Sequence, residues 1–397
     1  MPGFELFGDK EKQQVQDVLD SGVLMRYGFD GMRNGHWKAL ELEKAISKRM
    51  EVSHTQLVSS GTAALTIALA SAGVGAGDEV ILPTFTFVAS FESILALGAV
   101  PILVDVDDTL TLCPAAVEKA LTKNTKVVMP VHMCGSMADL EALKTICITH
   151  GLLLLEDACQ AIGGSYQGKP LGSYGDLGCF SFDYVKTITC GEGGAIITNN
   201  SKYYKNADHY SDHGHDHVGN NRGAEDHPFL GYNYRISELN AAVGVAQIKR
   251  LDEFLGIQKE HYTILRNTLK NIKGITFRSV PEGGVENYSF LSFFLPTEEI
   301  AKKAHTALSK AGLDGCFYWY DNNWHYYKKW SHLTNLTSLG KLPKEVHEQL
   351  PDYNTTDFSQ SDHWVGRNIS CLIKLGWTKE EVKQRAEKMA EVLKQQV

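Results

Sequence analysis

Short apolar runs recur between residues 79 and 198 and alternate with segments of helical character. The runs lie at 79–85, 100–106, 126–133, 152–158, 179–182 and 195–198. Several are almost continuously hydrophobic, which is typical of strands covered on both faces. The intervening segments include 62–73 and 139–151, both with helical spacing. This alternation predicts an α/β fold with a large, mainly parallel sheet and helices on both sides.

The segment from 201 to 232 is rich in histidine, aspartate, glycine and asparagine, and it predicts a long loop. A helix is expected directly after it, with Ser237 as its N-cap. One face of that helix would carry Leu239, Val243 and Ala246.

The C-terminal part predicts a smaller α+β domain. Its last helix has a capping-box pattern formed by Thr378 and Glu381. Apolar residues then recur at helical spacing, at Val382, Ala386, Met389 and Leu393. We therefore expect two domains, 1–254 and 255–397.

The composition is ordinary for a globular protein, with 43% hydrophobic and 22% charged residues in a chain of 397. A net charge of −8 disfavours nucleic acid or an anionic membrane as a partner. The apolar runs are too short to cross a bilayer, and the first residues lack the pattern of a secretory signal. Eight cysteines occur singly, which favours reduced thiols over a disulfide framework. We expect a cytoplasmic protein.

Lys186 is the first candidate for chemistry, because it precedes a Gly-Glu-Gly-Gly turn and has aromatic, β-branched and small neighbours. A lysine in a low-dielectric pocket loses its proton more easily, and the neutral amine can attack a carbonyl carbon. The alternative is a lysine that ends a strand and points to water.

A second candidate is SSGTAAL at 59–65, where Ser60, Gly61 and Thr62 open a helix. Small residues there let a phosphate approach the backbone N–H groups at the positive helix end. Ser181 lies five residues before Lys186, so a hydroxyl and an amine would hold a phosphate and a carbonyl carbon of one ligand. A simple helix cap is the alternative.

Two further segments follow predicted strands. In LLLLEDACQA, 152–161, Asp157 stands at the carboxyl end of a strand, where it would pair with a protonated pyridine nitrogen or cap a helix. In PTFTFVAS, 83–90, either Phe85 or Phe87 would lie flat against a ring, or both belong to the core. Pyridoxal 5′-phosphate needs all four features: a phosphate cup, a pyridinium partner, a stacking face and a lysine.

The order of these motifs resembles the DegT/DnrJ/EryC1/StrS sugar aminotransferases, which have the fold-type I architecture of pyridoxal-phosphate enzymes. The similar segments are SSGTAAL, EDACQAIGGSYQGKPLGSYGDLGCFSF, the lysine before GEGGAIIT, and GYNYRISELNAAVGVAQIKRLD. The resemblance covers nearly the whole chain. Some relatives replace the lysine by histidine and dehydrate their substrate, so the lysine here favours transamination.

The resemblance also implies roles for individual residues. Lys186 would bind the cofactor covalently and move the substrate proton, Asp157 would face the pyridine nitrogen, and Gln160 would lie near the phenolic oxygen of the ring. Phe87 would take the stacking position. The phosphate would be bound by Ser60, Gly61, Thr62 and Ser181. Asn233 would reach the phosphate held by a neighbouring subunit, which implies a homodimer with shared active sites.

Two segments differ from the common family pattern, 24–37 and 315–330. Together with CQAIGGSY, VKTITCGEGG and SDHGHDH they resemble a narrower branch, the 8-amino-3,8-dideoxy-manno-octulosonate aminotransferases. That branch uses glutamate to aminate the C8 aldehyde of an oxidised octulosonate before the sugar acid enters lipopolysaccharide. The alternatives are an aminotransferase for a nucleotide-linked keto-sugar and a cofactor-binding sensor without turnover.

A sugar acid and glutamate both carry carboxylates, so the site needs a cation. The candidates are Arg26, Arg33 and Lys374, each of which is otherwise a solvated charge or an ion-pair partner. The aromatic stretch 317–330, with Tyr320 and His325, would form a sugar-stacking wall or a dimer contact. His132 is either a pocket residue or a structural histidine.

The alternating histidines of SDHGHDH, which are His213, His215 and His217, invite a metal interpretation. No acidic or cysteine ligand set completes a site at a recognisable spacing, so we expect no metal there.

Overall fold

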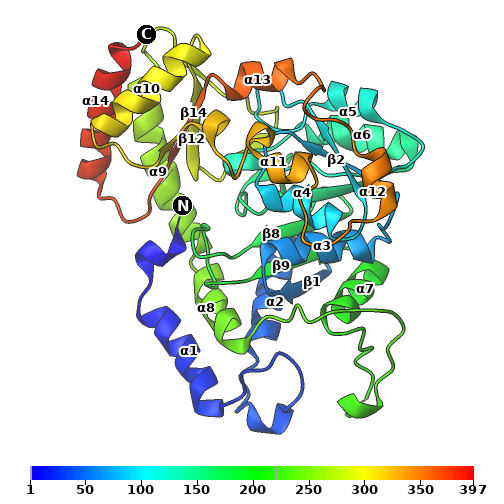
Figure 1. The fold of residues 1–397 in the computed structure, drawn as a ribbon. Coiled ribbons are helices and arrows are strands. Elements are labelled where there is room, and N and C mark those ends of the chain that lie inside the picture. The colour runs from blue at the N-terminus through cyan, green and yellow to red at the C-terminus, as the bar shows by residue number, and fades with distance from the viewer. Residues whose placement is uncertain (1, 220) are drawn as a thin grey trace.

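The computed structural model describes residues 2–219 and 221–397 and divides them into two α/β regions (Figure 1). The larger is built on a seven-stranded sheet of order β1-β9-β8-β5-β4-β2-β3. These strands are β1 (His54–Val58), β2 (Glu79–Pro83), β3 (Val100–Val104), β4 (Thr125–Val128), β5 (Leu153–Asp157), β8 (Leu177–Ser181) and β9 (Gly194–Thr198). The pairs from β3 through β8 are parallel, and β9 is antiparallel to both β8 and β1. The predicted, mainly parallel sheet is confirmed.

Helices cover both faces of this sheet, as the alternating pattern predicts. One face packs α3 (Gly61–Ser71), α4 (Val88–Leu95) and α7 (Ser201–Ser211) into a shared core. The other face packs α2 (Lys38–Met50), α5 (Pro114–Ala120), α6 (Leu140–His150) and α8 (Glu238–Ile248). The N-terminal α1 (Asp9–Ser21) lies against α8 (Figure 1).

The smaller region has an antiparallel sheet of order β10-β12-β14-β13. Its strands are β10 (Thr276–Phe277), β12 (Phe290–Phe294), β13 (Cys316–Phe317) and β14 (Asn368–Leu372). Helices α9 (Leu251–Leu269), α10 (Glu298–Lys310) and α14 (Lys379–Lys394) share its core, at the upper left of Figure 1. The Thr378–Glu381 capping box is confirmed at the start of α14, and Val382, Ala386, Met389 and Leu393 are buried as predicted.

The C-terminal part of the chain does not all pack on the small sheet. The short helices α11 (Ser331–Thr334), α12 (Lys344–Gln349) and α13 (Ser359–Val365) lie along the large region. Trp330, Tyr353 and Phe358 are buried in the same core as α3 and α4. The segment after β13 therefore crosses back over the large region and carries aromatic side chains to the carboxyl ends of its strands. A small ribbon, β11 (Gly284–Val285), β6 (Ser165–Tyr166) and β7 (Lys169–Pro170), joins the two regions.

The loop predicted over 201–232 is wrong in its first third, because α7 spans Ser201–Ser211. The Asn200 side chain caps this helix by accepting hydrogen bonds from the Lys202 and Tyr203 amides at 2.9 and 3.3 Å. Tyr203, Ala207 and Tyr210 recur at helical spacing and pack on the core, but the polar residues between them hide that period.

The helix expected after this segment is confirmed as α8, with the Ser237 hydroxyl accepting from the Asn240 amide at 3.2 Å. Its deeply buried positions include Ala241, Val245 and Ile248, whereas Leu239 and Val243 of the predicted face are only half-buried. Among the described residues, no helix combines the length and the apolar character that crossing a bilayer requires.

Candidate active site

A cavity of about 780 Å³ lies at the carboxyl ends of β5 and β8 and is lined by both regions. The large region contributes the Ser60–Thr62 turn, Phe87, Asp157 and Lys186. The small region contributes Phe290, Phe317, Leu372 and Lys374, and the N-terminal residues 2, 4 and 5 close one side. This is the place where ligands bind in open α/β sheets.

One end of the cavity is built by the first turn of α3. The Ser60 hydroxyl caps the helix by accepting from the Ala63 amide at 3.0 Å, while Gly61, Thr62 and Ser181 line the cavity beside it. A methyl group at Gly61 would lie 2.7 Å from the Ser181 Cβ and 3.1 Å from its Oγ. Glycine is thus required for the helix terminus and the end of β8 to approach so closely. The arrangement offers hydroxyls and free helix N–H groups to an anion.

Asp157 occupies the last position of β5 and is 3% exposed. Its Oδ2 accepts a hydrogen bond from the Ser90 hydroxyl at 2.7 Å, and its Oδ1 accepts from the Cys159 amide at 3.2 Å. Gln160 follows in the same turn, where its side-chain oxygen accepts from the Cys134 amide at 2.9 Å. The hydrogen bonds from Ser90 and Cys159 orient the Asp157 carboxylate in the cavity lining, and its oxygens can still accept from a cation.

Lys186 lies in the turn between β8 and β9, with its side chain half-buried in the cavity wall. Its amide donates to the Asp183 carbonyl at 3.0 Å, and its own carbonyl accepts from the Gly3 amide at 2.9 Å. The N-terminal segment thereby holds the lysine backbone. Phe4 stacks on Tyr184 with ring centroids 4.1 Å apart, and the Glu5 carboxylate accepts from the Leu375 and Gly376 amides at 2.7 and 2.9 Å.

An aromatic wall lines the same cavity as Lys186. Phe87 lies 5.6 Å from Trp324 and 5.4 Å from His325 between ring centroids, and His325 lies 4.5 Å from Trp319. The backbone fixes this wall, because Thr86 donates to the His325 carbonyl and Val88 to the Trp324 carbonyl. Phe85 is fully buried in the core, so Phe87 is the phenylalanine of this pair that reaches the cavity.

His325 is held as a neutral imidazole. Burial lowers its pKa to about 3, and the nearby Lys186 ammonium adds to this effect. Its Nδ1 donates to the Asn322 side-chain oxygen at 2.9 Å, which leaves Nε2 as the acceptor. His325 and Asn322 both line the cavity, and the sugar-binding role of His325 stays a prediction.

Lys374 also reaches the cavity, just beyond β14. Its Nζ lies 2.5 Å from Asp314 Oδ2, and Arg385 Nη1 lies 3.0 Å from Asp314 Oδ1. Two cations therefore share one carboxylate, so the group keeps a net positive charge.

Other predicted substrate contacts are not brought to this cavity. Arg26 is 5% exposed, and its Nη2 donates to both carboxylate oxygens of Glu43 at 2.6–2.7 Å. Arg33 is 2% exposed and donates to the Gly28 and Met25 carbonyls. Because these guanidinium groups are buried and already paired, they are not available to a ligand carboxylate in this cavity.

His132 and Tyr320 are also engaged elsewhere. His132 is fully buried, and its Nε2 lies 2.9 Å from a Glu156 carboxylate oxygen, which is the structural alternative. The Tyr320 hydroxyl accepts from Lys328 Nζ at 3.2 Å, and the ring packs 5.2 Å from Tyr326. Neither is among the described residues that line the cavity.

Asn233 is exposed and is not among the described residues that line this cavity; it lies opposite Asp212 in an isolated β-bridge. The SDHGHDH segment next to it is organised by ion pairs. His217 donates from Nδ1 to Asp208 at 2.8 Å and from Nε2 to Asp212 at 2.9 Å. Burial opposes the charged form, but these hydrogen bonds raise the pKa of His217 to about 9. His215 instead faces Glu225 at 2.9 Å.

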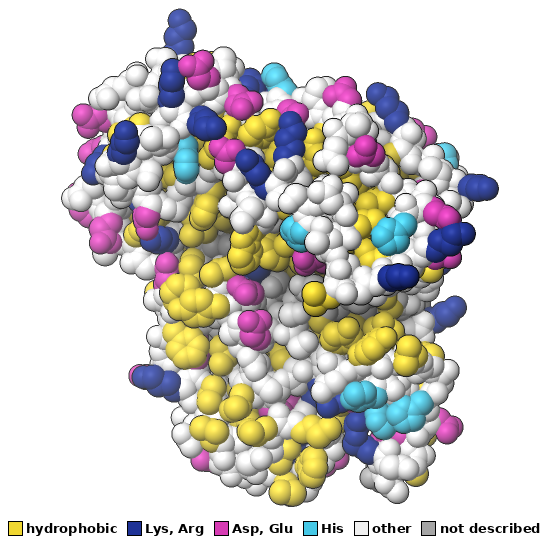
Figure 2. Space-filling model, viewed as in Figure 1, with side chains coloured by type: hydrophobic (Ala, Val, Ile, Leu, Met, Phe, Trp, Pro, Cys, Tyr) yellow, Lys and Arg dark blue, Asp and Glu magenta, His cyan; other side chains and the backbone are white. Residues whose placement is uncertain are grey.

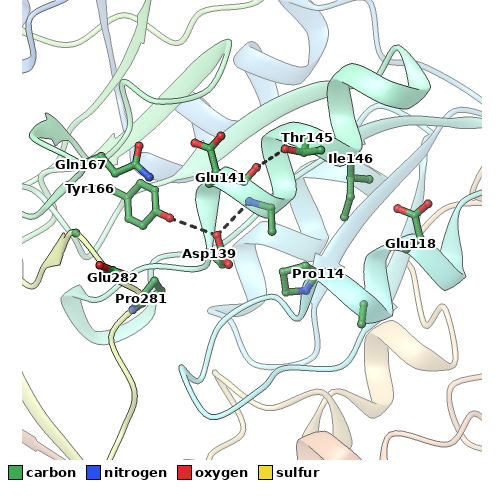
Figure 3. A pocket seen from close by; sticks show the side chains of 13 residues that line it. Pro114, Glu118, Asp139, Glu141, Thr145, Ile146, Tyr166, Gln167, Pro281 and Glu282 are labelled. Carbon is green, nitrogen blue, oxygen red and sulfur yellow. Dashed lines mark hydrogen bonds between the residues drawn. The ribbon is translucent and has the colours of Figure 1, made fainter.

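A second cavity, on another part of the surface, has a different character (Figure 3). Its side chains include Glu118, Asp139, Glu141 and Glu282, and the Tyr166 hydroxyl donates to Asp139 at 3.3 Å. The carboxylates make it unsuited to a phosphate or a sugar acid, in contrast to the cavity around Lys186.

Several residues of the site were missed by the sequence analysis. Ser90 lies three residues after Phe87 in the first turn of α4, and that spacing is the signal that places both beside the cavity. The N-terminal residues 2–5 gave no signal, because their contacts are with Lys186 and the loop before α14.

A buried acid at the end of β5, a lysine in the turn after β8, a helix terminus for phosphate and a stacking ring define a pyridoxal-phosphate enzyme of fold type I. A model of the DegT/DnrJ/EryC1/StrS aminotransferase family matches residues 6–389. The chain belongs to this family, and it is a pyridoxal-phosphate-dependent sugar aminotransferase.

Individual relatives agree with this assignment. The 3-amino-5-hydroxybenzoate synthase of Amycolatopsis mediterranei is 36% identical over 320 residues, which is 79% of either chain. A GDP-perosamine synthase of Vibrio cholerae is 34% identical over 290 residues, 72% of this chain and 75% of the relative. The crystal structure of 3-amino-5-hydroxybenzoic acid synthase superposes with a TM-score of 0.81 at 30% identity, covering 97% of this chain and 96% of the other.

Proposed function

We propose that this enzyme transfers the amino group of L-glutamate to the C8 aldehyde of 3,8-dideoxy-8-oxo-manno-octulosonate. The product would be 8-amino-3,8-dideoxy-manno-octulosonate, a sugar acid for lipopolysaccharide. The observation that carries the aminotransferase part is the meeting of Lys186, Asp157, Phe87 and the first turn of α3 in one cavity.

The residues present fit pyridoxal 5′-phosphate. Gly61, Thr62 and Ser181, with the helix N–H groups, would hold the phosphate, and Asp157 would hold the protonated ring nitrogen. Phe87 would lie against the ring, and Gln160 near its phenolic oxygen. When bound, the cofactor supplies an aldehyde carbon and an electron-accepting ring through which an amino group passes between an amino acid and a carbonyl compound.

The chain's own residues would contribute an amine that moves a proton and hydrogen bonds that keep the Asp157 carboxylate oriented. Lys186 Nζ would take the proton from the α carbon of glutamate and return it within the same cavity. In the second half-reaction the same amine would place a proton on the sugar carbon that receives the amino group. Ser90 and Cys159 would keep the Asp157 carboxylate oriented throughout.

The sugar-acid substrate is supported by the chemistry of other residues in and beside the cavity. Lys374, with Asp314 and Arg385, presents a net positive group that suits the carboxylate of an octulosonate or of glutamate. The neutral His325 offers Nε2 as an acceptor for a sugar hydroxyl. Trp324 and Trp319 beside it supply the apolar faces on which sugars commonly pack. All of these residues except Arg385 and Asp314 line the cavity.

A nucleotide-linked keto-sugar is the second candidate. It is favoured by the similarity to GDP-perosamine synthase, whose name states a nucleotide-linked product. Such a substrate would need room and cations for a pyrophosphate, whereas Lys186 and Lys374 are the cationic side chains among the described lining residues.

We also propose a homodimer with shared sites. Large apolar side chains are exposed on the N-terminal segment, including Leu24, Phe29 and Met32, and on the segment after α7, including Phe229 and Leu230. Figure 2 shows hydrophobic side chains spread over the lower part of this face, where Figure 1 has α1, α8 and the segment after α7. Asn233 of one subunit would then approach the phosphate bound by the other.

A half-reaction panel tests the substrate. The enzyme is first loaded with glutamate, and loss of the cofactor's absorbance band is expected. Oxidised octulosonate or a nucleotide-linked keto-sugar is then added, and recovery of the band is followed. Recovery only with the octulosonate supports the proposal, and recovery only with the keto-sugar contradicts it.

A variant pair adds a structural arm to this panel. Lys374→Gln should raise the KM for the octulosonate aldehyde, whereas Lys379→Gln, whose side chain pairs with Glu260 on the surface, should not. Equal KM values in the two variants would remove the role given to Lys374.

A further inference from the structure

Two cysteines of the small sheet lie directly opposite each other. Cys316 on β13 pairs with Cys371 on β14 in antiparallel register, and their sulfur atoms are 3.2 Å apart. Both are free thiols. Among the described residues, no other two thiols lie within hydrogen-bonding distance of each other. The pair has no local signal in the sequence, because the two cysteines are 55 positions apart.

The backbone geometry already fits a disulfide. Directly opposite residues of an antiparallel pair have Cα atoms about 4.5–5.5 Å apart, which lies inside the range of disulfide bonds. The sulfur atoms must approach by about 1 Å to reach a bond length of about 2.05 Å. Small side-chain rotations supply this movement, so the sheet need not change register.

The surroundings make the two thiols unequal. The hydrogen bond from Cys371 is the main cause that lowers the pKa of Cys316, and the Arg385 guanidinium, 4.0 Å from its sulfur, acts in the same direction. That same contact, together with burial, raises the pKa of Cys371 well above its usual value. Cys316 is also the more accessible, since it is half-buried whereas Cys371 is 1% exposed. A thiolate at Cys316 is therefore the nucleophile of the pair.

We propose that Cys316 and Cys371 form an oxidative modification site that closes to a disulfide when hydrogen peroxide reacts with the enzyme. The Cys316 thiolate attacks one peroxide oxygen, the O–O bond breaks, and hydroxide leaves and is protonated to water. The resulting sulfenic acid is attacked by the Cys371 sulfur, which loses its proton as the second water leaves. Two thiols are oxidised and one peroxide is reduced to two waters, and a dithiol reverses the change by exchange.

The bond would form directly behind the active-site wall. Phe317 and Leu372, the next residues along the two strands, both line the cavity around Lys186. The closed loop from Cys316 to Cys371 contains Trp324 and His325, so the disulfide ties both ends of the segment that forms the aromatic wall. Cross-linking a loop of this length restricts the unfolded chain and should raise the thermal unfolding midpoint of the oxidised enzyme.

The test uses the holoenzyme treated with a small excess of hydrogen peroxide. Thiol titration under denaturing conditions should fall from eight to six per chain, and a dithiol should restore eight. Peptide mass mapping should recover the peptide of Cys316 joined to that of Cys371. A linked pair elsewhere, or eight thiols retained, overturns the proposal.

Serine variants give the matched control. Cys316→Ser and Cys371→Ser should each abolish the paired loss, whereas Cys113→Ser, which removes another half-buried thiol, should leave it unchanged. Loss of a pair from Cys316→Ser at the wild-type rate would contradict the assignment. The peptide map of the wild-type enzyme decides the question even if a variant fails to fold.

Discussion

Replacement of Gly61 by alanine should separate cofactor binding from folding. The new methyl group would lie 2.7 Å from the Ser181 Cβ, 3.1 Å from its Oγ and 3.2 Å from the Cys159 sulfur. Contacts this short force the end of β8 away from the helix terminus, at a cost of about 1–3 kcal/mol. Alanine in place of glycine gains about 0.5–1 kcal/mol in a helix interior, and the first helical position gains at most that much, so the net loss of stability should be about 0–2.5 kcal/mol.

Cofactor binding should suffer more than stability does. Moving Ser181 removes a hydroxyl donor from the phosphate, and a hydrogen bond to a charged group is worth about 1.5–3 kcal/mol. Since about 1.4 kcal/mol corresponds to a tenfold change in affinity, Gly61→Ala should bind pyridoxal 5′-phosphate about 10- to 100-fold more weakly. Titration of the apoenzyme, followed by quenching of tryptophan fluorescence, gives the dissociation constant.

Gly256→Ala is the matched control, because Gly256 lies within α9 and its added methyl meets nothing within 4 Å. It should raise the unfolding midpoint slightly and leave the dissociation constant for the cofactor unchanged. If Gly61→Ala binds the cofactor as tightly as Gly256→Ala, the phosphate does not lie at the start of α3.

Three further changes test other parts of the account. Ser90→Ala should lower kcat about tenfold, because the charged Asp157 carboxylate loses one hydrogen bond. Ser93→Ala removes only a hydrogen bond within α4 and should leave kcat unchanged, so equal kcat values in the two variants would refute the role of Ser90. His217→Gln should destabilise the protein most below pH 6.5, and the deficit in the free energy of unfolding should vanish as the pH rises through about 9, since a raised pKa stabilises only the protonated form; a deficit constant from pH 6 to 10 would contradict this. Glu5→Gln should lower the thermal midpoint and kcat together, because the two amides before α14 lose a charged acceptor, and an unchanged midpoint would refute that coupling.

The parts of the site that depend on neighbouring residues in the chain could be predicted from the sequence. Asp157 ends an apolar run, Lys186 precedes a glycine turn, and Gly61 opens a helix, so each could be assigned to the carboxyl edge of one sheet before its neighbours were known. Phe85 and Phe87 could not be separated by alternation alone. The bridge between Phe85 and Tyr326 decides between them, because it turns Phe85 into the core.

The misplaced residues share a different cause. Arg26 binds Glu43, and His132 binds Glu156. In both pairs the partner is distant in the sequence and is brought close only by the fold. A cation candidate can be recognised by residue type, but whether its charge is free depends on which carboxylate the fold brings to it. Lys374 differs because Arg385 shares its carboxylate partner, and that arrangement has no local signature.

The most direct test of the account is the identity of the lysine that carries the cofactor. The holoenzyme is reduced with borohydride, digested, and mapped by peptide mass. We expect the pyridoxyl label on Lys186 and its absence from Lys374, the other lysine among the described residues that line the cavity. A label on any other lysine, or on none, would contradict the central claim.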